Sequence, residues 1–166
     1  LVGKKPIIFT NNDSAYDTAI EFKKNGITPL IIDVRKNSES IVIKEAKDLG
    51  INIKFSHAIA NTKGYLRVNS AIVGKLNNDK SGYENLENIS CDCICVSGNW
   101  TPTVHLSSQS GNKLRFDEMI SAFIPNQARQ NETTVGSAKG SFTLKKSLED
   151  GFNKGFEVSN KLTKKN

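Results

Sequence analysis

The feature that most constrains the fold is an alternation within residues 6–55 between short apolar runs and amphipathic helical patterns. The apolar runs are five or six residues long, which is typical of buried strands, and the first two lead into apolar residues at helical spacing. Connections this short require right-handed crossovers, so the strands are expected to be parallel. We predict strands over residues 6–10, 29–34 and 51–55, with helices that begin at Asp13 or Ser14 and at Ser38.

Beyond His57 the pattern changes to short alternating segments separated by Asn, Gly, Asp and Lys turns. It predicts an antiparallel meander of two or three strands over about residues 57–90, after which Cys91–Val96 returns to the sheet. The fold class is therefore α/β, a Rossmann-like three-layer β-α-β unit with an antiparallel β-meander. Further short strands are expected over residues 113–116, 122–124 and 133–135.

A C-terminal amphipathic helix is predicted from Leu144, Leu148 and Phe152. Gly151 and Gly155 lie one turn apart in this helix, where each glycine costs up to about 1 kcal/mol. We therefore expect the helix to pack closely against a neighbour, either the remaining strands or another copy of the chain.

Net charge and hydropathy exclude several functions. The formal charge of +6 suggests a nucleic-acid partner, but the lysines are scattered among acidic and amide residues, so no nucleic-acid binding is predicted. No apolar run reaches about 18 residues, which argues against a membrane span. The N-terminal residues resemble neither a signal nor a transit peptide, and a chain that begins at Leu1 is expected to be a piece of something longer. We predict a cytoplasmic location.

Three cysteines, Cys91, Cys93 and Cys95, alternate along one predicted strand and would point to one face. An odd number at this spacing argues against a disulfide framework, and a thiolate metal site would lack its fourth ligand. We predict free thiols that pack as small apolar groups in a reducing compartment, and no metal site.

The first strand-to-helix turn is the candidate ligand site. A dinucleotide site of the Rossmann kind needs small residues there, so that the backbone and the helix N-terminus can approach the pyrophosphate. Here Thr10 and Asn12 stand at the two leading glycine positions, and Asp13 places a negative charge beside the expected phosphate. The turn is by itself a poor dinucleotide fingerprint.

Asp33 ends the second strand about twenty residues later, where an acid would accept a hydrogen bond from a ribose 2′-hydroxyl. This would favour NAD over NADP, although Arg35 blurs the choice, and an ordinary strand-end aspartate is an equal alternative. His57 and His105 have no nucleophile partner at a recognisable spacing, so no catalytic residue is predicted.

Three segments resemble one family, in the order in which the family has them. They are Phe9–Ala19 (FTNNDSAYDTA), Val96–Asp117 (VSGNWTPTVHLSSQSGNKLRFD), and Phe123-Ile-Pro followed by Gly136–Leu144 (GSAKGSFTL) and Gly151. The family is the alpha subunit of heterotetrameric sarcosine oxidase.

The resemblance implies a complex that oxidatively demethylates sarcosine to glycine and forms peroxide. Its partners would be the beta, gamma and delta subunits. FAD and FMN would lie on a partner subunit, whereas the alpha subunit is associated with NAD and carries a folate-binding region elsewhere. This chain would supply NAD binding and subunit assembly rather than the chemical step.

The resemblance also divides the chain. Residues 1–130 would be an inserted NAD-type unit of the FAD/NAD(P)-binding disulfide-reductase type, and residues 131–166 the returning strand and closing helix of an outer unit. If NAD sits in the outer unit, Gly136, Ser137 and Ala138 would line it, and Ser137 in place of an aspartate makes FAD there doubtful. The inserted unit would then be a decayed dinucleotide domain. The candidate cofactor-binding residues are Thr10, Asn11, Asn12, Asp13, Ser14, Asp33, Arg35, Ser97, Gly98, Gly136, Ser137 and Ala138.

Three other functions stay open at this point. One is an NADH-dependent flavin reductase domain of the disulfide-reductase type. Another is the alpha subunit of a related amine or opine oxidase. The third is an interaction module that binds no nucleotide.

Overall fold

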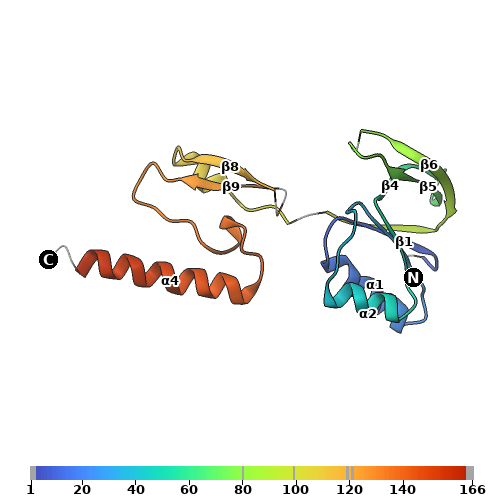
Figure 1. The fold of residues 1–166 in the computed structure, drawn as a ribbon, viewed down its shortest axis with the longest axis horizontal. Helices are drawn as coiled ribbons and strands as arrows, with labels where there is room; N and C mark the ends of the chain where they lie inside the picture. Colours follow the sequence, from blue (N-terminus) through green and yellow to red (C-terminus); the bar gives the residue numbers. More distant parts are fainter. Residues whose placement is uncertain (1–2, 80, 99, 119, 121, 164–166) are drawn as a thin grey trace. The chain divides into compact units, whose positions relative to one another are not determined.

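A computed structural model describes residues 3–79, 81–98, 100–118, 120 and 122–163 (Figure 1). The chain forms two compact units, Leu1–Gly98 (unit 1) and Asn99–Asn166 (unit 2). The predicted boundary between residues 130 and 131 rests on the family resemblance and stays a prediction. Strand β9 (Ala122–Gln127) contacts η1 (Gly136–Lys139), and both lie in unit 2.

Unit 1 is built on a four-stranded parallel sheet with the strand order β3-β2-β1-β7. The strands are β1 (Pro6–Thr10), β2 (Leu30–Asp33), β3 (Asn52–Phe55) and β7 (Cys93–Ser97). Two helices, α1 (Ser14–Lys24) and α2 (Ile41–Asp48), form the crossovers between the first three strands. The predicted parallel βαβαβ arrangement is thereby confirmed.

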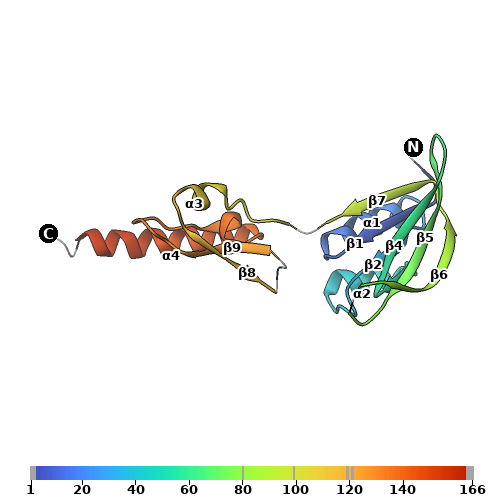
Figure 2. The same ribbon diagram turned by 90° about the horizontal axis from the view of Figure 1, so that it is seen from above.

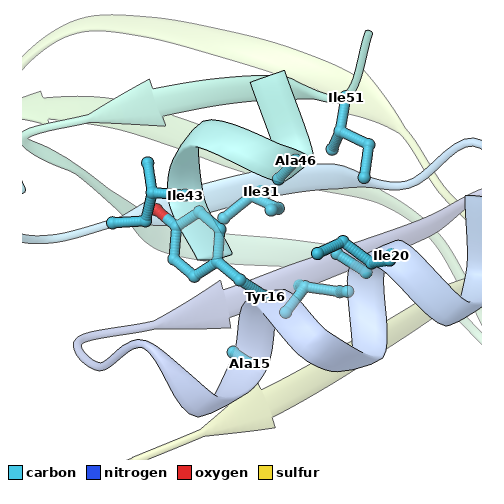
Figure 3. Packing of buried hydrophobic residues seen from close by; sticks show 9 residues of the cluster. Ala15, Tyr16, Ile20, Ile31, Ile43, Ala46 and Ile51 are labelled. Carbon is cyan, nitrogen blue, oxygen red and sulfur yellow. The ribbon is translucent and has the colours of Figure 1, made fainter. Parts of the chain in front are cut away.

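The two faces of this sheet have different covers, which makes three layers. Helices α1 and α2 pack on one face through Tyr16, Ile20 and Ile43, all of which are buried against Ile31 of β2 (Figure 3). The other face is covered by the predicted antiparallel meander (Figure 2), which consists of β4 (His57–Gly64), β5 (Val68–Leu76) and β6 (Tyr83–Ser90).

One predicted helix boundary is wrong. Helix α2 is capped by Ser40 rather than by Ser38, and the Ser40 hydroxyl accepts a hydrogen bond from the Ile43 amide at 3.5 Å. Both serines have the side chain that an N-cap requires, but the helix begins at Ile41, so Ser40 is the residue that caps it.

The cysteines do not share one face, contrary to the prediction. Strand β7 begins only at Cys93, and the chain bends at Asp92, so Cys91 is buried in the cluster between the sheet and the meander. Cys95 packs on the helix side, with its Sγ 3.9 Å from that of Cys93. Burial and the hydrogen bond with Cys93 raise the pKa of Cys95 to about 11.

Unit 2 contains two short helical turns, a hairpin and one long helix. In chain order these are α3 (His105–Gln109), which the sequence pattern did not indicate, β8 (Lys113–Asp117), β9, η1 and α4 (Leu144–Thr163). Strands β8 and β9 form an antiparallel pair in which Phe116 lies opposite Phe123. The predicted strand over residues 133–135 is absent from the described part of the chain. Val135 has an extended backbone, but a strand also needs a partner strand, and no described segment pairs with this one.

The apolar side of α4 is exposed. Leu144, Leu148 and Phe152 are 65–76% exposed, and the stripe continues through Phe156. Gly151 and Gly155 have no described atom within 4 Å of where a Cβ would stand, so the close packing predicted for these glycines does not occur within the described structure. No helix in the described ranges is long and apolar enough to cross a membrane.

Candidate functional site

The predicted site residues of unit 1 lie at the carboxyl ends of β1, β2 and β7. The chain leaves β1 toward β2 on one side, while β7 lies on the other, so this is the switch point at which open α/β sheets bind ligands. A depression of about 130 Å³ lies here, lined by Thr10, Asn11, Ser97 and Gly98 together with Phe9, Val34 and Val96. Ligand pockets of about 300 Å³ or more are usual, so this one is small.

The Asn12 side chain ties the first turn to the end of β7. Its Nδ2 donates to the carbonyl oxygens of Gly98 at 2.7 Å and Ser97 at 3.2 Å. Its Oδ1 accepts from both the amide and the hydroxyl of Ser14, at 3.1 and 2.6 Å. Asn12 therefore uses the first amide of α1, one of the donors that a pyrophosphate would need, and links the two strands that border the crevice.

The turn is also closed on itself through Thr10. The Thr10 hydroxyl accepts from the Asn12 amide and donates to the Asn12 carbonyl oxygen, both at 3.1 Å. These bonds hold the backbone of the turn in place without glycine at either leading position.

Asp33 is fully buried and surrounded by partners from its own chain. The Tyr16 hydroxyl donates to Oδ2 at 2.7 Å, and the Arg35 amide donates to Oδ1 at 3.0 Å. The Arg35 guanidinium adds bonds to both oxygens, the shortest at 2.7 Å. With both oxygens engaged, the geometry does not leave this carboxylate facing a ribose hydroxyl.

Arg35 joins two acids that the sequence placed apart. Its second terminal nitrogen bonds Asp13 at 2.7 Å, so the charge that was expected to repel a phosphate is paired. Burial opposes the Arg35 charge, but the bonds to Asp33 and Asp13 outweigh it and raise the pKa of Arg35. Burial, followed by the bond to Asp33, raises the pKa of Tyr16 well above its ordinary value. The network therefore stays charged at Arg35 and neutral at Tyr16 around neutral pH.

Tyr16 was not identified as a site residue from the sequence. The apolar pattern of α1 accounts for Tyr16 as a core residue, and only the fold shows that its hydroxyl reaches Asp33 at the end of β2. A tyrosine in the first turn of the helix, followed by an Asp-x-Arg at the end of the second strand, is the signal that could have suggested this network.

The remaining candidate residues lie in unit 2. Gly136 begins η1 at a φ of +65°, which glycine adopts without strain, and Ser137 is exposed. The segment is anchored to α4, because the Ser141 hydroxyl donates to Asp150 at 2.6 Å and the Ser147 hydroxyl donates to the Ser141 carbonyl oxygen at 2.8 Å. The structure thus brings the Thr10–Ser14 turn, Asp33, Arg35, Ser97 and Gly98 together in unit 1 and holds Gly136, Ser137 and Ala138 in unit 2.

No described cluster of three or more His, Cys, Asp or Glu side chains could hold a metal ion. His57 contacts the Phe55 carbonyl oxygen through Nδ1 at 2.6 Å, and His105 is the first residue of α3.

Sequence comparison identifies relatives that agree with the motifs. No protein-family profile matches the chain. Over 151 residues, or 90% of its length, the chain is 29% identical to sarcosine oxidase subunit alpha from Corynebacterium sp. strain U-96, and equally to that from strain P-1. The chain is similar to sarcosine oxidase subunit alpha. The predicted resemblance is confirmed, and the chain spans 15% of the length of these sarcosine oxidase subunits.

Comparison with solved structures confirms the fold class. Thioredoxin reductase from T. acidophilum superposes with a TM-score of 0.66 at 16% identity, over 89% of this chain and 49% of the reductase. Thioredoxin reductase from Lactococcus lactis gives 0.64 at 14% identity, with the same coverage of both chains. A HOCl-induced flavoprotein disulfide reductase from Escherichia coli gives 0.61 at 13% identity, over 90% of this chain and 34% of that one. These relatives and neighbours are oxidoreductases, and the fold is that of disulfide reductases.

Proposed function

We propose that this chain is part of the alpha subunit of a sarcosine-oxidase-like complex and acts in assembly and NAD binding rather than in the chemical step. The complex would demethylate sarcosine oxidatively and form peroxide, with FAD and FMN on a partner subunit. The similarity to sarcosine oxidase subunit alpha supports the choice of complex. The three free cysteines fit a reducing compartment such as the cytoplasm.

The observation that carries the assignment of roles is that the polar groups at the unit 1 crevice are already hydrogen-bonded within the chain. Asp33, the acid expected to bind a ribose, is buried under Tyr16 and Arg35, and Asn12 links the turn to β7. A dinucleotide would have to break both sets of bonds in order to dock. Unit 1 is therefore proposed to be a scaffold, a dinucleotide domain whose ligand-binding groups are bonded to its own side chains.

NAD binding is proposed for the segment of Gly136, Ser137 and Ala138 in unit 2. Gly136 has no Cβ to obstruct a ligand at its φ of +65°, and Ser137 is exposed. In this proposal residues 131–166 are the returning strand and closing helix of an outer unit. The extended backbone at Val135, which pairs with no described strand, and the exposed stripe of α4 support that role, because a β-α segment buries such a stripe against a sheet. The beta, gamma and delta subunits are the proposed partners of the complete protein.

Calorimetric titration of the parent alpha subunit with NAD tests the location of the site. Ala138→Tyr is expected to abolish the binding heat, since the ring would fill the proposed site. Ser97→Tyr, which blocks the unit 1 crevice, is expected to bind NAD as the unaltered protein does. Ala128→Tyr places the same ring on an exposed position of unit 2 and serves as the matched control.

Loss of NAD binding in Ser97→Tyr, with binding retained in Ala138→Tyr, would place the cofactor in unit 1 and contradict the proposal. Absence of heat with the unaltered alpha subunit would end the NAD assignment. NADH-dependent flavin reduction is expected to be absent from the isolated chain, and turnover there would favour the flavin reductase alternative.

A further inference from the structure

A second pocket in unit 1 lies beside the carboxyl ends of β2 and β3 and has a volume of about 240 Å³. It contains none of the residues expected to bind a dinucleotide, and Val34 is its one residue in common with the crevice at β1 and β7. Its lining residues are Val34, Lys36, Ser56, Lys75, Leu76, Asn77 and Asn78.

Four of the lining side chains carry hydrogen-bond donors without a partner in the described part of the chain. The ammonium groups of Lys36 and Lys75, the Ser56 hydroxyl and the Asn78 amide have no hydrogen-bond or ion-pair partner among the described residues. Glu84 lies opposite Lys75 in the β5–β6 register, yet the two side chains form no ion pair within the described structure. Two cations and two neutral donors thus line one small concavity.

Ser56 occupies this pocket in a conformation that a side chain disfavours. Its φ is +56°, in the left-handed region, where a Cβ is crowded. Two backbone bonds hold it there, because its amide donates to the Arg35 carbonyl oxygen at 2.8 Å and its carbonyl oxygen accepts from the Leu76 amide at 2.7 Å. Glycine would adopt this conformation without strain, whereas the serine side chain carries a local conformational penalty.

We propose that this pocket binds a phosphate group, either as inorganic phosphate or as the phosphomonoester of a small molecule. Two ammonium groups match the charge of a phosphate dianion, and the serine hydroxyl and the asparagine amide supply neutral donors to its oxygens. The volume holds a phosphate and a few further heavy atoms but is below that of ordinary drug-sized sites. The proposal is independent of the NAD assignment and of the identity of the complex.

Titration calorimetry of the 166-residue chain with inorganic phosphate, and separately with glycerol 3-phosphate, tests the site at constant ionic strength set with chloride. Lys36→Ala and Lys75→Ala are each expected to weaken phosphate binding by about tenfold or more, since each removes a charged hydrogen bond. Lys44→Ala removes an exposed lysine from α2 and is expected to leave the affinity unchanged. Tighter binding of glycerol 3-phosphate than of phosphate would identify a phosphomonoester as the ligand, and the reverse order would identify the free anion.

The proposal is overturned if neither probe binds saturably, or if both lysine variants bind phosphate as the unaltered chain does. An equal loss in Lys44→Ala would show attraction by net charge alone and would overturn it as well.

Ser56→Gly provides a test that does not depend on charge. Glycine relieves the positive φ, so this variant is expected to have a higher Tm and a lower phosphate affinity than the unaltered chain. Asn85→Gly is the matched control, because Asn85 also has a positive φ, of +51°, but lies outside the pocket. It is expected to leave phosphate affinity unchanged. Full phosphate affinity in Ser56→Gly would overturn the role of the hydroxyl.

Discussion

At the residue scale, Arg35 is the residue that engages the two acids beside the crevice of unit 1. It binds the buried Asp33 through two nitrogens and the half-buried Asp13 through a third. A buried carboxylate is stable only with such partners, because desolvation otherwise opposes its charge. The same bonds that satisfy both oxygens of the buried Asp33 also remove it from the reach of a ligand.

Replacement of Arg35 by Met is expected to lower the free energy of unfolding by about 3 kcal/mol, because Asp33 would remain buried without its counter-charge. Urea unfolding monitored by circular dichroism measures this. The double variant Arg35→Met/Asp33→Asn is expected to recover part of the loss, since an amide needs no counter-charge. Lys36→Met is the control, because it removes a neighbouring cation that has no described partner. In phosphate-free buffer it is expected to change the free energy of unfolding by no more than about 0.5 kcal/mol. Equal stability of the Arg35→Met variant and the unaltered chain would show that the network contributes nothing.

At the element scale, α4 is stabilised on its polar side and has nothing on its apolar side among the described residues. Glu157 bonds Lys154 at 2.5 Å and Lys161 at 2.9 Å, one turn to either side. The opposite side presents Leu144, Leu148 and their neighbours to solvent. Helices of globular proteins owe most of their stability to burial of such a stripe, so the isolated chain leaves α4 dependent on local charge pairs.

The helicity of α4 is therefore expected to decrease at low pH. The bond from Lys154, and then that from Lys161, lowers the pKa of Glu157 from 4.5 to about 2. Because the folded pKa is depressed, the contribution of this group is complete above pH 4.5 and is lost as the pH falls toward 2. Circular dichroism should show loss of helix in that pH range, and Glu157→Gln should already have lost the stabilisation by Glu157 at neutral pH. Glu149 has no ion pair in the described structure, so Glu149→Gln should lose its helix signal over the same pH range as the unaltered chain.

At the scale of the whole molecule, the two units differ in how much core they have. The two clusters of buried apolar residues found among the described residues lie in unit 1, on the two faces of its sheet. Among the described residues of unit 2, the buried apolar side chains are those of Pro102, Ala122 and Ile124. The stability of unit 2 in the isolated chain therefore rests on few contacts.

Native-state hydrogen exchange should separate the two units. Amides of β1 and β2 are expected to exchange only on global unfolding of unit 1, whereas amides of α4 and of β8 exchange by local opening with a lower free energy. Mass spectrometry of peptides after exchange measures this difference. Protection of α4 equal to that of β1 would contradict it and would show that the helix is covered in solution.

The parallel βαβαβ half, the meander and the resemblance to sarcosine oxidase subunit alpha could all be predicted from the amino-acid sequence. These depend on spacing within a segment, and Ala15, Ala19 and Ala46 show their buried face through helical periodicity alone. Three findings could not be predicted in this way. Asp33 faces Tyr16 and Arg35 rather than a ligand, Cys91 lies apart from Cys95, and residues 133–135 have no partner strand in the described chain. Each of these outcomes depends on which residues of other segments contact the side chain or strand in the folded protein. Burial and hydrogen bonding between segments determine these contacts, and the periodicity of one segment carries no information about the residues of another.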